Sequence, residues 1–254
     1  MSESTPILFY QQDLRMSKSK SKRTQWLRIA AVLILCVTCT LFPANKKADA
    51  SKKRLSAQFK SLLEDGRANY LDALEKEVIL HLNMARTDPE KYAKKYIAPR
   101  KRFFEGNIYH DPRNPQFENG YWTQEGLKAV RECVNVMKKV TPAGALLPSE
   151  RISIAAQAHA RHQSRTGSIG HVGPDGSKPG TRLRQFGSWR ITGENISYGF
   201  NTASEIVACL LVDDGVRNRK HRSIILDPQF SIVGVAIEPH PIYQYVCVIN
   251  FAGG

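Results

Sequence analysis

The sequence lacks the short motifs by which many enzymes bind nucleotides or metals. It contains no GxGxxG, no P-loop and no HExxH pattern, and beyond residue 50 it has no CxxC pair. Cysteine is scarce, with five in 254 residues, and Cys36 and Cys39 lie together in one apolar run. The other three, Cys133, Cys209 and Cys247, are widely spaced in apolar patterns. We therefore expect buried free thiols and no disulfide framework.

The sequence also lacks an apolar run of the roughly 20 residues that a membrane-spanning helix needs. The 14-residue run 29–42 follows a basic segment at 15–28 and precedes Ala48-Asp49-Ala50. These are the parts of a secretory signal, so we expect residues 1–50 to be a signal peptide, with an N-terminal anchor as the alternative and Met16 as a second candidate start. The protein is thus predicted to be secreted, extracellular or located in the cell envelope.

Acidic residues are fewer than basic ones: 23 Asp and Glu accompany 37 Lys and Arg, and the net charge is +14. Residues 1–50 contain three of the former and eight of the latter, which leaves 20 and 29 for residues 51–254. This moderate excess favours anionic partners such as lipid headgroups or glycans, and no dedicated nucleic-acid binding is expected. The basic run at 94–104, KKYIAPRKRFF, is either a phosphate or sulfate site or a solvated surface.

Hydrophobic residues make up 42% of the chain, enough to bury a core. We predict a linker at 51–70 and one domain at 71–254. Helical spacing predicts helices from Leu71 to Pro89, from Leu127 to Pro142 and from Ser149 to Gly167. Residues 87–123 contain four prolines and are predicted to form a long loop with short helical pieces.

The last third of the chain is predicted to mix one helix with strands. TASE at 202–205 has the pattern of a capping box, in which Thr202 caps the helix and Glu205 reaches back. ITGENISYGF is predicted to be a short strand or loop, and FSIVGVAI and QYVCVINFA are predicted strands. The fold class is therefore α/β or α+β, with helices covering a small sheet.

Two polar residues occupy apolar helix faces. His159 follows Ile152, Ala155 and Ala156 at helical spacing and is interpreted as a hydrogen-bonded core histidine. Asp213 lies three residues after Leu210 at the predicted inward side of a helix end, where a solvated carboxylate is not expected.

Several motifs occur in a distinctive order: AAQAHARHQ, GHVGPDG, GENISYG and KHRSIILDPQFSIVGVAI. Together they resemble the CAP superfamily of cysteine-rich secretory proteins, antigen 5 and pathogenesis-related 1 proteins, in its bacterial form without the animal disulfides. The resemblance covers about residues 71–254, with an insertion at about 87–144. It implies a three-layer α-β-α sandwich with a central cleft.

The resemblance also implies that the cleft holds two histidines and two acids. By motif these are His171, Glu194, Asp213 and His221. Asp213 stands where the family has glutamate, so its reach is in question and Asp214 is a possible substitute. Leu210 replaces the usual tryptophan of the family.

Two imidazoles and two carboxylates can hold Zn²⁺ or another divalent metal, with His171 and His221 as ligands and Glu194 and Asp213 around them. If only the histidines bind, the acids would orient them. Without metal, the same set would be a structural network or an acid–base centre. Both histidines are expected on irregular loops, and the cations around His221 are expected to oppose a bound cation.

The sequence is compatible with three functions. The leading hypothesis is a binding module whose cleft takes a divalent metal and, as the resemblance suggests, a lipid or anionic ligand. The second is a secreted hydrolase, which is weakened by the lack of an evident nucleophile, since Ser168 near His171 is poor support alone. The third is a structural envelope protein.

Overall fold

The structure is a computed structural model that describes residues 68–254. The predicted signal peptide at 1–50 and nearly all of the predicted linker at 51–70 lie outside this range. No helix within the described range is long and apolar enough to cross a membrane.

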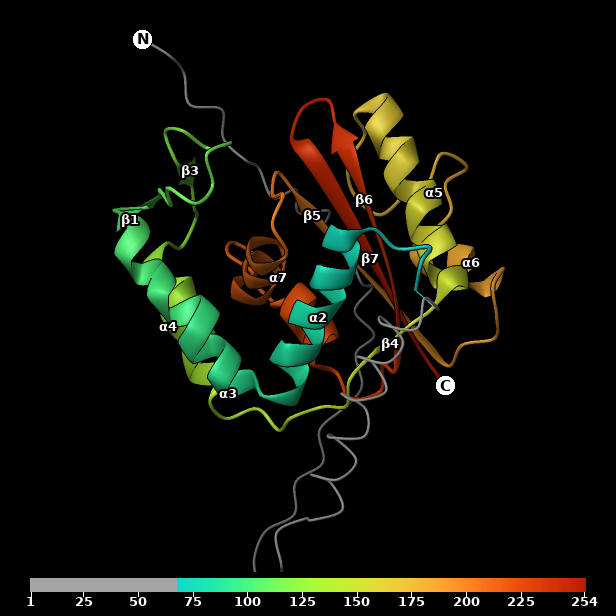
Figure 1. Cartoon of the computed structure of the whole chain (residues 1–254), viewed down its shortest axis with the longest axis horizontal. Coiled ribbons are helices and arrows are strands. Elements are labelled where there is room, and N and C mark those ends of the chain that lie inside the picture. Colours follow the sequence, from blue (N-terminus) through green and yellow to red (C-terminus); the bar gives the residue numbers. More distant parts are fainter. Residues whose placement is uncertain (1–67) are drawn as a thin grey trace, which may run out of the picture.

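A four-stranded sheet with the order β4-β6-β7-β5 lies at the centre of the described part (Figure 1). Its strands are β4 (Leu147–Pro148), β5 (Ile191–Tyr198), β6 (Ile232–His240) and β7 (Gln244–Gly253). β7 pairs antiparallel with both β5 and β6, and β4 pairs parallel with β6. The three strands predicted from the sequence are thereby confirmed. Most of β7 is buried because helices cover both faces of the sheet, which explains its nearly continuous apolar run.

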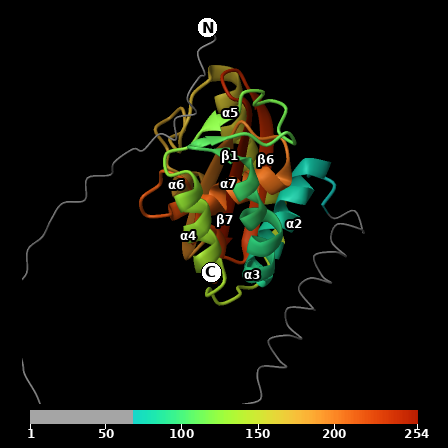
Figure 2. The ribbon, with the colours of Figure 1, turned by 90° about the vertical axis from the view of Figure 1, so that its left-hand side faces the viewer.

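Helices form a layer on each side of this sheet, as Figures 1 and 2 show from two directions. One layer contains α5 (Glu150–Thr166) and α6 (Pro179–Arg184). The other contains α2 (Ala73–Thr87), α7 (Ala203–Val212) and α8 (Lys220–Leu226). The predicted three-layer α-β-α sandwich is confirmed by this arrangement.

The predicted limits of α5 agree with the structure for identifiable local reasons, whereas α4 (Leu127–Met137) ends before the predicted end at Pro142. α5 begins after Ser149 and ends at Gly167, whose φ of 69° is left-handed and favours glycine. α5 also lies unusually close to β6, since a Cβ added to Gly234 would come within 2.3 Å of the backbone of Ile152. The glycine therefore sets the spacing between this helix and the sheet.

Residues 87–144, here called the extra segment, form a folded unit on the outer side of α7 (Figure 1). Its elements are α3 (Pro89–Tyr92), the π-helix η1 (Ala93–Ile97), the 3-10 helix η2 (Ala98–Phe103), β1 (Phe104–Glu105), β2 (Ile108–Tyr109), β3 (Tyr121–Trp122) and α4 (Leu127–Met137). The short helical pieces were predicted, whereas the small antiparallel sheet β1-β2-β3 was not. Ile97, Tyr109 and Met137 belong to the main core. The segment is thus an integral part of the domain.

The capping box predicted at 202–205 is wrong. Thr202 occupies the N-cap position of α7 but makes no side-chain cap bond. Glu205 instead accepts a hydrogen bond of 2.6 Å from Arg100, and both side chains are almost fully buried. An unpaired buried guanidinium costs more free energy than a helix end that lacks a side-chain cap, so Glu205 pairs with Arg100. Arg100 belongs to the basic run at 94–104, so part of that run is internal and not available to an anion.

The three cysteines of the described part, Cys133, Cys209 and Cys247, are free and buried, which confirms the prediction. Burial raises the pKa of the Cys133 thiol to about 11 and that of Cys209 to about 12. These thiols are therefore neutral packing groups near neutral pH.

Candidate functional site

The first half of the candidate site joins His171 to β5. Glu194 lies in the middle of β5 with 5% of its surface exposed. Its Oε1 is 2.9 Å from Nδ1 of His171, and its Oε2 accepts a hydrogen bond of 2.8 Å from Arg182 on α6. A carboxylate that faces Nδ1 favours the tautomer with its proton on that nitrogen, and this leaves Nε2 as the free lone pair.

A buried network holds the loop that leads to His171. The carbonyl oxygen of Gly170 lies 2.9 Å from Nε2 of His159 and accepts a 2.6 Å bond from Gln163. The amide of Gly170 donates to the hydroxyl of Tyr198, which in turn donates to Gln163. Burial lowers the pKa of His159, so its imidazole is neutral near neutral pH. The prediction of a hydrogen-bonded core histidine is confirmed. In the structure, His159 supports the loop that leads to His171.

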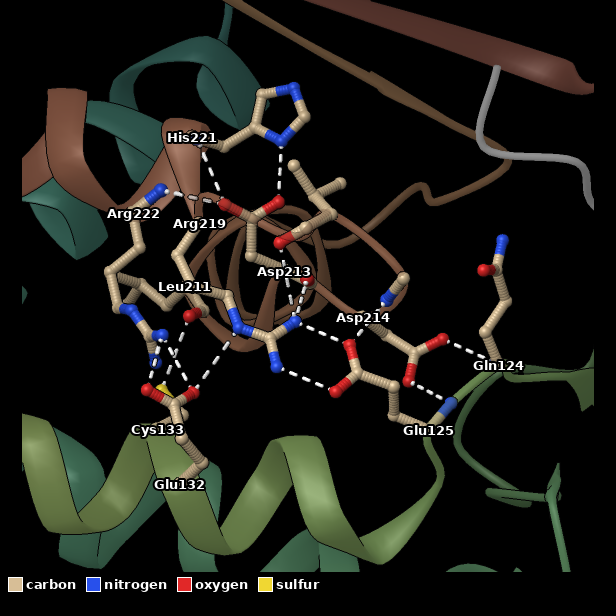
Figure 3. Close-up of polar contacts among 12 residues, drawn as sticks. Gln124, Glu125, Glu132, Cys133, Leu211, Asp213, Asp214, Arg219, His221 and Arg222 are labelled. Carbon is tan, nitrogen blue, oxygen red and sulfur yellow. Dashed lines mark hydrogen bonds and ion pairs between the residues drawn. The ribbon is translucent and has the colours of Figure 1, made fainter. Parts of the chain in front are cut away.

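The second half of the site lies between α7 and α8 (Figure 3). Asp213 caps the C-terminus of α7 in a left-handed conformation, with φ 56° and ψ 43°, and is 3% exposed. Its Oδ1 is 2.6 Å from Nδ1 of His221, and its Oδ2 accepts from the backbone amides of His221 and Arg222 at 2.9 and 3.2 Å. The shorter aspartate therefore reaches its histidine. His221 lies in the first turn of α8, so the prediction of an irregular loop is wrong for this residue.

Asp214 does not substitute for Asp213. Its carboxylate accepts hydrogen bonds from the backbone amides of Gln124 and Glu125 at 2.6 and 2.9 Å (Figure 3). The side chain thus ties the end of α7 to the extra segment. Burial raises the pKa of this carboxyl, although both backbone hydrogen bonds act in the opposite direction.

The cations around His221 are partly neutralised by acids that are distant in the sequence but in contact with them in the structure. Arg219 forms two hydrogen bonds with Glu125, at 2.6 and 2.7 Å. Arg222 forms two with Glu132, at 2.8 and 2.7 Å. The expectation that the cations around His221 oppose a bound cation therefore overstates the positive charge at this site. Sequence reasoning missed these acids because they precede their partners by about ninety residues.

The four predicted residues are thus brought together as two pairs, His171 with Glu194 and His221 with Asp213. Within residues 68–254, no group of three or more His, Cys, Asp and Glu side chains is arranged to hold a metal ion. A four-ligand set is accordingly not formed in this structure. Each carboxylate instead contacts Nδ1 of its histidine, which is the position of an orienting partner.

A pocket of about 490 Å³ opens beside His171, between α6, β5 and α8. Its lining is mixed: Ile224 and Phe230 are apolar, whereas Lys220, Ser223 and Glu194 are polar. Lys220, Ser223 and Ile224 follow helical spacing on one face of α8, and His221 is not among the residues that line the pocket. The pocket therefore adjoins the first pair more closely than the second.

The structure gives Ser168 no role as a nucleophile. Its hydroxyl lies 2.8 Å from the hydroxyl of Thr166, and within the described range no hydrogen bond joins it to His171. A serine needs an adjacent base to be activated, so this residue does not favour the hydrolase hypothesis.

Comparison with known proteins identifies the class to which this fold and site belong. Residues 131–251 match the model of the cysteine-rich secretory protein family, known as CAP. The predicted resemblance to the CAP superfamily is thereby confirmed for residues 131–251. All four predicted site residues lie inside the matched segment, whereas Glu125 lies before it.

Similarity to individual proteins is limited in extent. An uncharacterized protein, YkwD, of Bacillus subtilis (strain 168) is 29% identical over 109 residues, which is 42% of this chain and 40% of YkwD. The chain therefore matches well under half of the length of this curated relative.

Among solved structures, an outer surface protein of Borrelia burgdorferi is 17% identical with a TM-score of 0.38, and the match covers 48% of this chain and 87% of that one. An extracellular protein containing an SCP domain from Bacillus anthracis str. Ames is 21% identical with a TM-score of 0.35, covering 48% of this chain and 37% of that one.

Proposed function

We propose that the chain is a secreted or envelope-located binding module of the CAP type. The observation that supports this most directly is the pocket beside His171, which combines an apolar lining with charged groups and an exposed imidazole that the buried carboxylate of Glu194 orients. Ligand sites commonly have this composition, with an apolar body and a few polar groups that fix orientation. No described group next to the pocket offers an activated nucleophile, so binding is favoured over hydrolysis.

The pocket suits a small amphiphile with an anionic head. Phe230 and Ile224 offer an apolar surface, and the ammonium of Lys220 lines the same pocket without an ion pair inside the described range. An acyl chain could lie on the former while its carboxylate or phosphate meets the latter. This accords with the lipid ligand that the family resemblance implies and with the anionic partner that the charge favours. It also accords with the moderate basic charge of the chain.

A divalent metal is proposed as an additional ligand of the two histidines. Glu194 lies within hydrogen-bond distance of Nδ1 of His171, and Asp213 within the same reach of Nδ1 of His221. The Nε2 nitrogens of the two histidines are therefore the atoms that would hold Zn²⁺ or another divalent ion. Two protein ligands would leave the remaining positions of the ion to water or to a ligand in the cleft. Such a site would bind weakly and would polarise an oxygen of that ligand.

Calorimetric titration with zinc tests the metal proposal. We expect His171→Ala and His221→Ala to abolish uptake while the protein remains folded. Glu194→Gln should weaken uptake about 10- to 100-fold, because it removes an orienting partner and no ligand. His162→Ala, on the same helix as His159, is the control and should bind like the wild type.

Equal zinc binding by the wild type and both alanine variants would refute the proposed ligands. No binding by the wild type would leave the two pairs as structural braces of the cleft. Native mass spectrometry with elemental analysis of the exported protein would then report the N-terminus, any metal and any retained amphiphile together. An N-terminus at Ser51 is expected, and an attached segment 29–42 would contradict signal cleavage.

A further inference from the structure

The loop 213–219, which joins α7 to α8, begins and ends in an unusual backbone conformation. φ is 56° at Asp213 and 48° at Arg219, and in the described range only one other non-glycine residue, Gln244, has a positive φ. Such conformations are unfavourable for residues with side chains and persist where surrounding contacts hold them. Because His221 follows Arg219 by two residues, this loop determines where α8 begins and where the imidazole lies.

Most of the side-chain contacts that hold the loop come from Glu125, just before α4 in the extra segment (Figure 3). Its carboxylate accepts two hydrogen bonds from Arg219 in a bidentate arrangement, at 2.6 and 2.7 Å. The same carboxylate accepts from the backbone amide of Gly215 at 2.9 Å. Arg219 also donates to the carbonyl oxygen of Asp213 at 2.7 Å, which joins the two ends of the loop. Glu125 therefore contacts the middle of the loop at Gly215. Through the guanidinium of Arg219, it also holds the two ends of the loop together.

Two further acids, Asp214 and Glu132, join the extra segment to the loop and to α8. Asp214 accepts from the backbone amide of Glu125 itself, so the two chain segments are bonded in both directions. Glu132, on α4, lies 3.4 Å from Nε of Arg219 and also binds the buried guanidinium of Arg222, whose backbone amide donates to Asp213. The extra segment thus supports the histidine–aspartate pair from two sides.

We infer that Glu125 is a positioning residue for His221. Acting through Arg219, it holds the loop in the one conformation in which the carboxylate of Asp213 faces Nδ1 of the imidazole and leaves Nε2 available. Glu125 precedes the segment 131–251 that matches the family, so the extra segment supplies this support. The inference deepens the proposed function, and it rests on that function only where zinc uptake is the readout.

Nitrogen-15 NMR of the histidine rings in the full-length chain tests the inference directly. In the wild type, His171 and His221 should both show the tautomer with the proton on Nδ1, as their carboxylate partners require. Glu125→Gln removes the charge with almost no change in shape, and Arg219→Lys keeps the charge but cannot form the bidentate contact. Both variants should move His221 toward a mixture of tautomers and leave His171 unchanged. Zinc affinity should fall about tenfold in each.

Glu238→Gln is the matched control, because Glu238 pairs with Arg161 at 3.3 Å on the α5 side of the sheet. It should alter neither ring. A lower melting temperature in Glu125→Gln with an unchanged His221 spectrum would overturn the inference, since Glu125 would then be an ordinary stabilising ion pair. Equal changes in both histidines would also overturn it, because they would indicate general loosening. If the wild type takes up no zinc, the metal proposal fails, and the ring spectra still decide the role of Glu125.

Discussion

Asp213 shows how much the local backbone decides at the scale of a single residue. Its left-handed conformation ends α7 and turns the carboxylate back toward the first turn of α8. There it accepts from two backbone amides and contacts the imidazole of His221. A carboxylate can do all of this because it has only acceptor positions.

Replacing this aspartate by asparagine should reverse the tautomer of His221. The amide oxygen of Asp213→Asn can still accept from the amides of His221 and Arg222, which turns its NH₂ group toward Nδ1. The imidazole must then carry its proton on Nε2, so zinc uptake should fall at least about tenfold. The free energy of unfolding should fall by only about 1 kcal/mol. Ring nitrogen shifts of His221 report the change, and a spectrum identical to that of the wild type would contradict it.

The elements themselves differ in how well the sequence predicts them. α5 was predictable because its apolar stripe repeats over four turns and ends at a left-handed glycine. The sheet β1-β2-β3 was not, because strands of two residues show no periodicity. The pairing of Glu205 with Arg100 was not predictable either. It joins residues 105 positions apart, and it overrode a local pattern that indicated a cap.

The contact between α5 and β6 provides a test at the level of these elements. Gly234→Ala would place a Cβ 2.3 Å from the backbone of Ile152, and helix backbone cannot give way as a flexible side chain can. We expect a loss of about 3 kcal/mol in the free energy of unfolding, measured by urea denaturation. Gly106→Ala is the control: its φ of 58° is unfavourable for alanine, but no atom lies within 4 Å. It should cost about 1 kcal/mol. Equal losses would show that packing at Gly234 is not the cause.

The site was predictable only in part. The motifs indicated His171, Glu194, Asp213 and His221, and the structure joins them as two pairs. The groups that support each pair could not be predicted, because their contacts depend on how distant segments fold together. The role of Glu125 in particular follows from a contact 94 residues along the chain.

The molecule as a whole should lose stability in mild acid. Burial lowers the pKa of His81 to about 4, and burial also lowers the pKa of His159. In the unfolded chain histidine titrates near pH ~6.5, so below that pH the unfolded state binds protons that the folded state does not. The free energy of unfolding should therefore fall as the pH drops from about 6.5 toward about 4, and be unaffected by these groups above that range.

Urea midpoints at about pH 7 and about pH 5 measure this loss, in a range where most carboxyl groups remain ionised. His81→Gln keeps a partner for the hydroxyl of Tyr92, 3.0 Å from the imidazole, and removes the titrating group. The variant should lose less stability between the two pH values than the wild type. Parallel losses in the two proteins would exclude His81 as a cause.

The two halves of the site are supported by different parts of the chain. This difference predicts which half unfolds locally first. The loop that carries His171 depends on Gln163 of α5 and Tyr198 of β5, through contacts that span 7 to 35 residues. His221 depends on contacts that span 90 to 94 residues and belong to the extra segment. Contiguous parts of a protein that are bonded to each other commonly open and close as one cooperative unit. Amide hydrogens around His221 should therefore exchange with solvent together with those of α4, and before those beside His171.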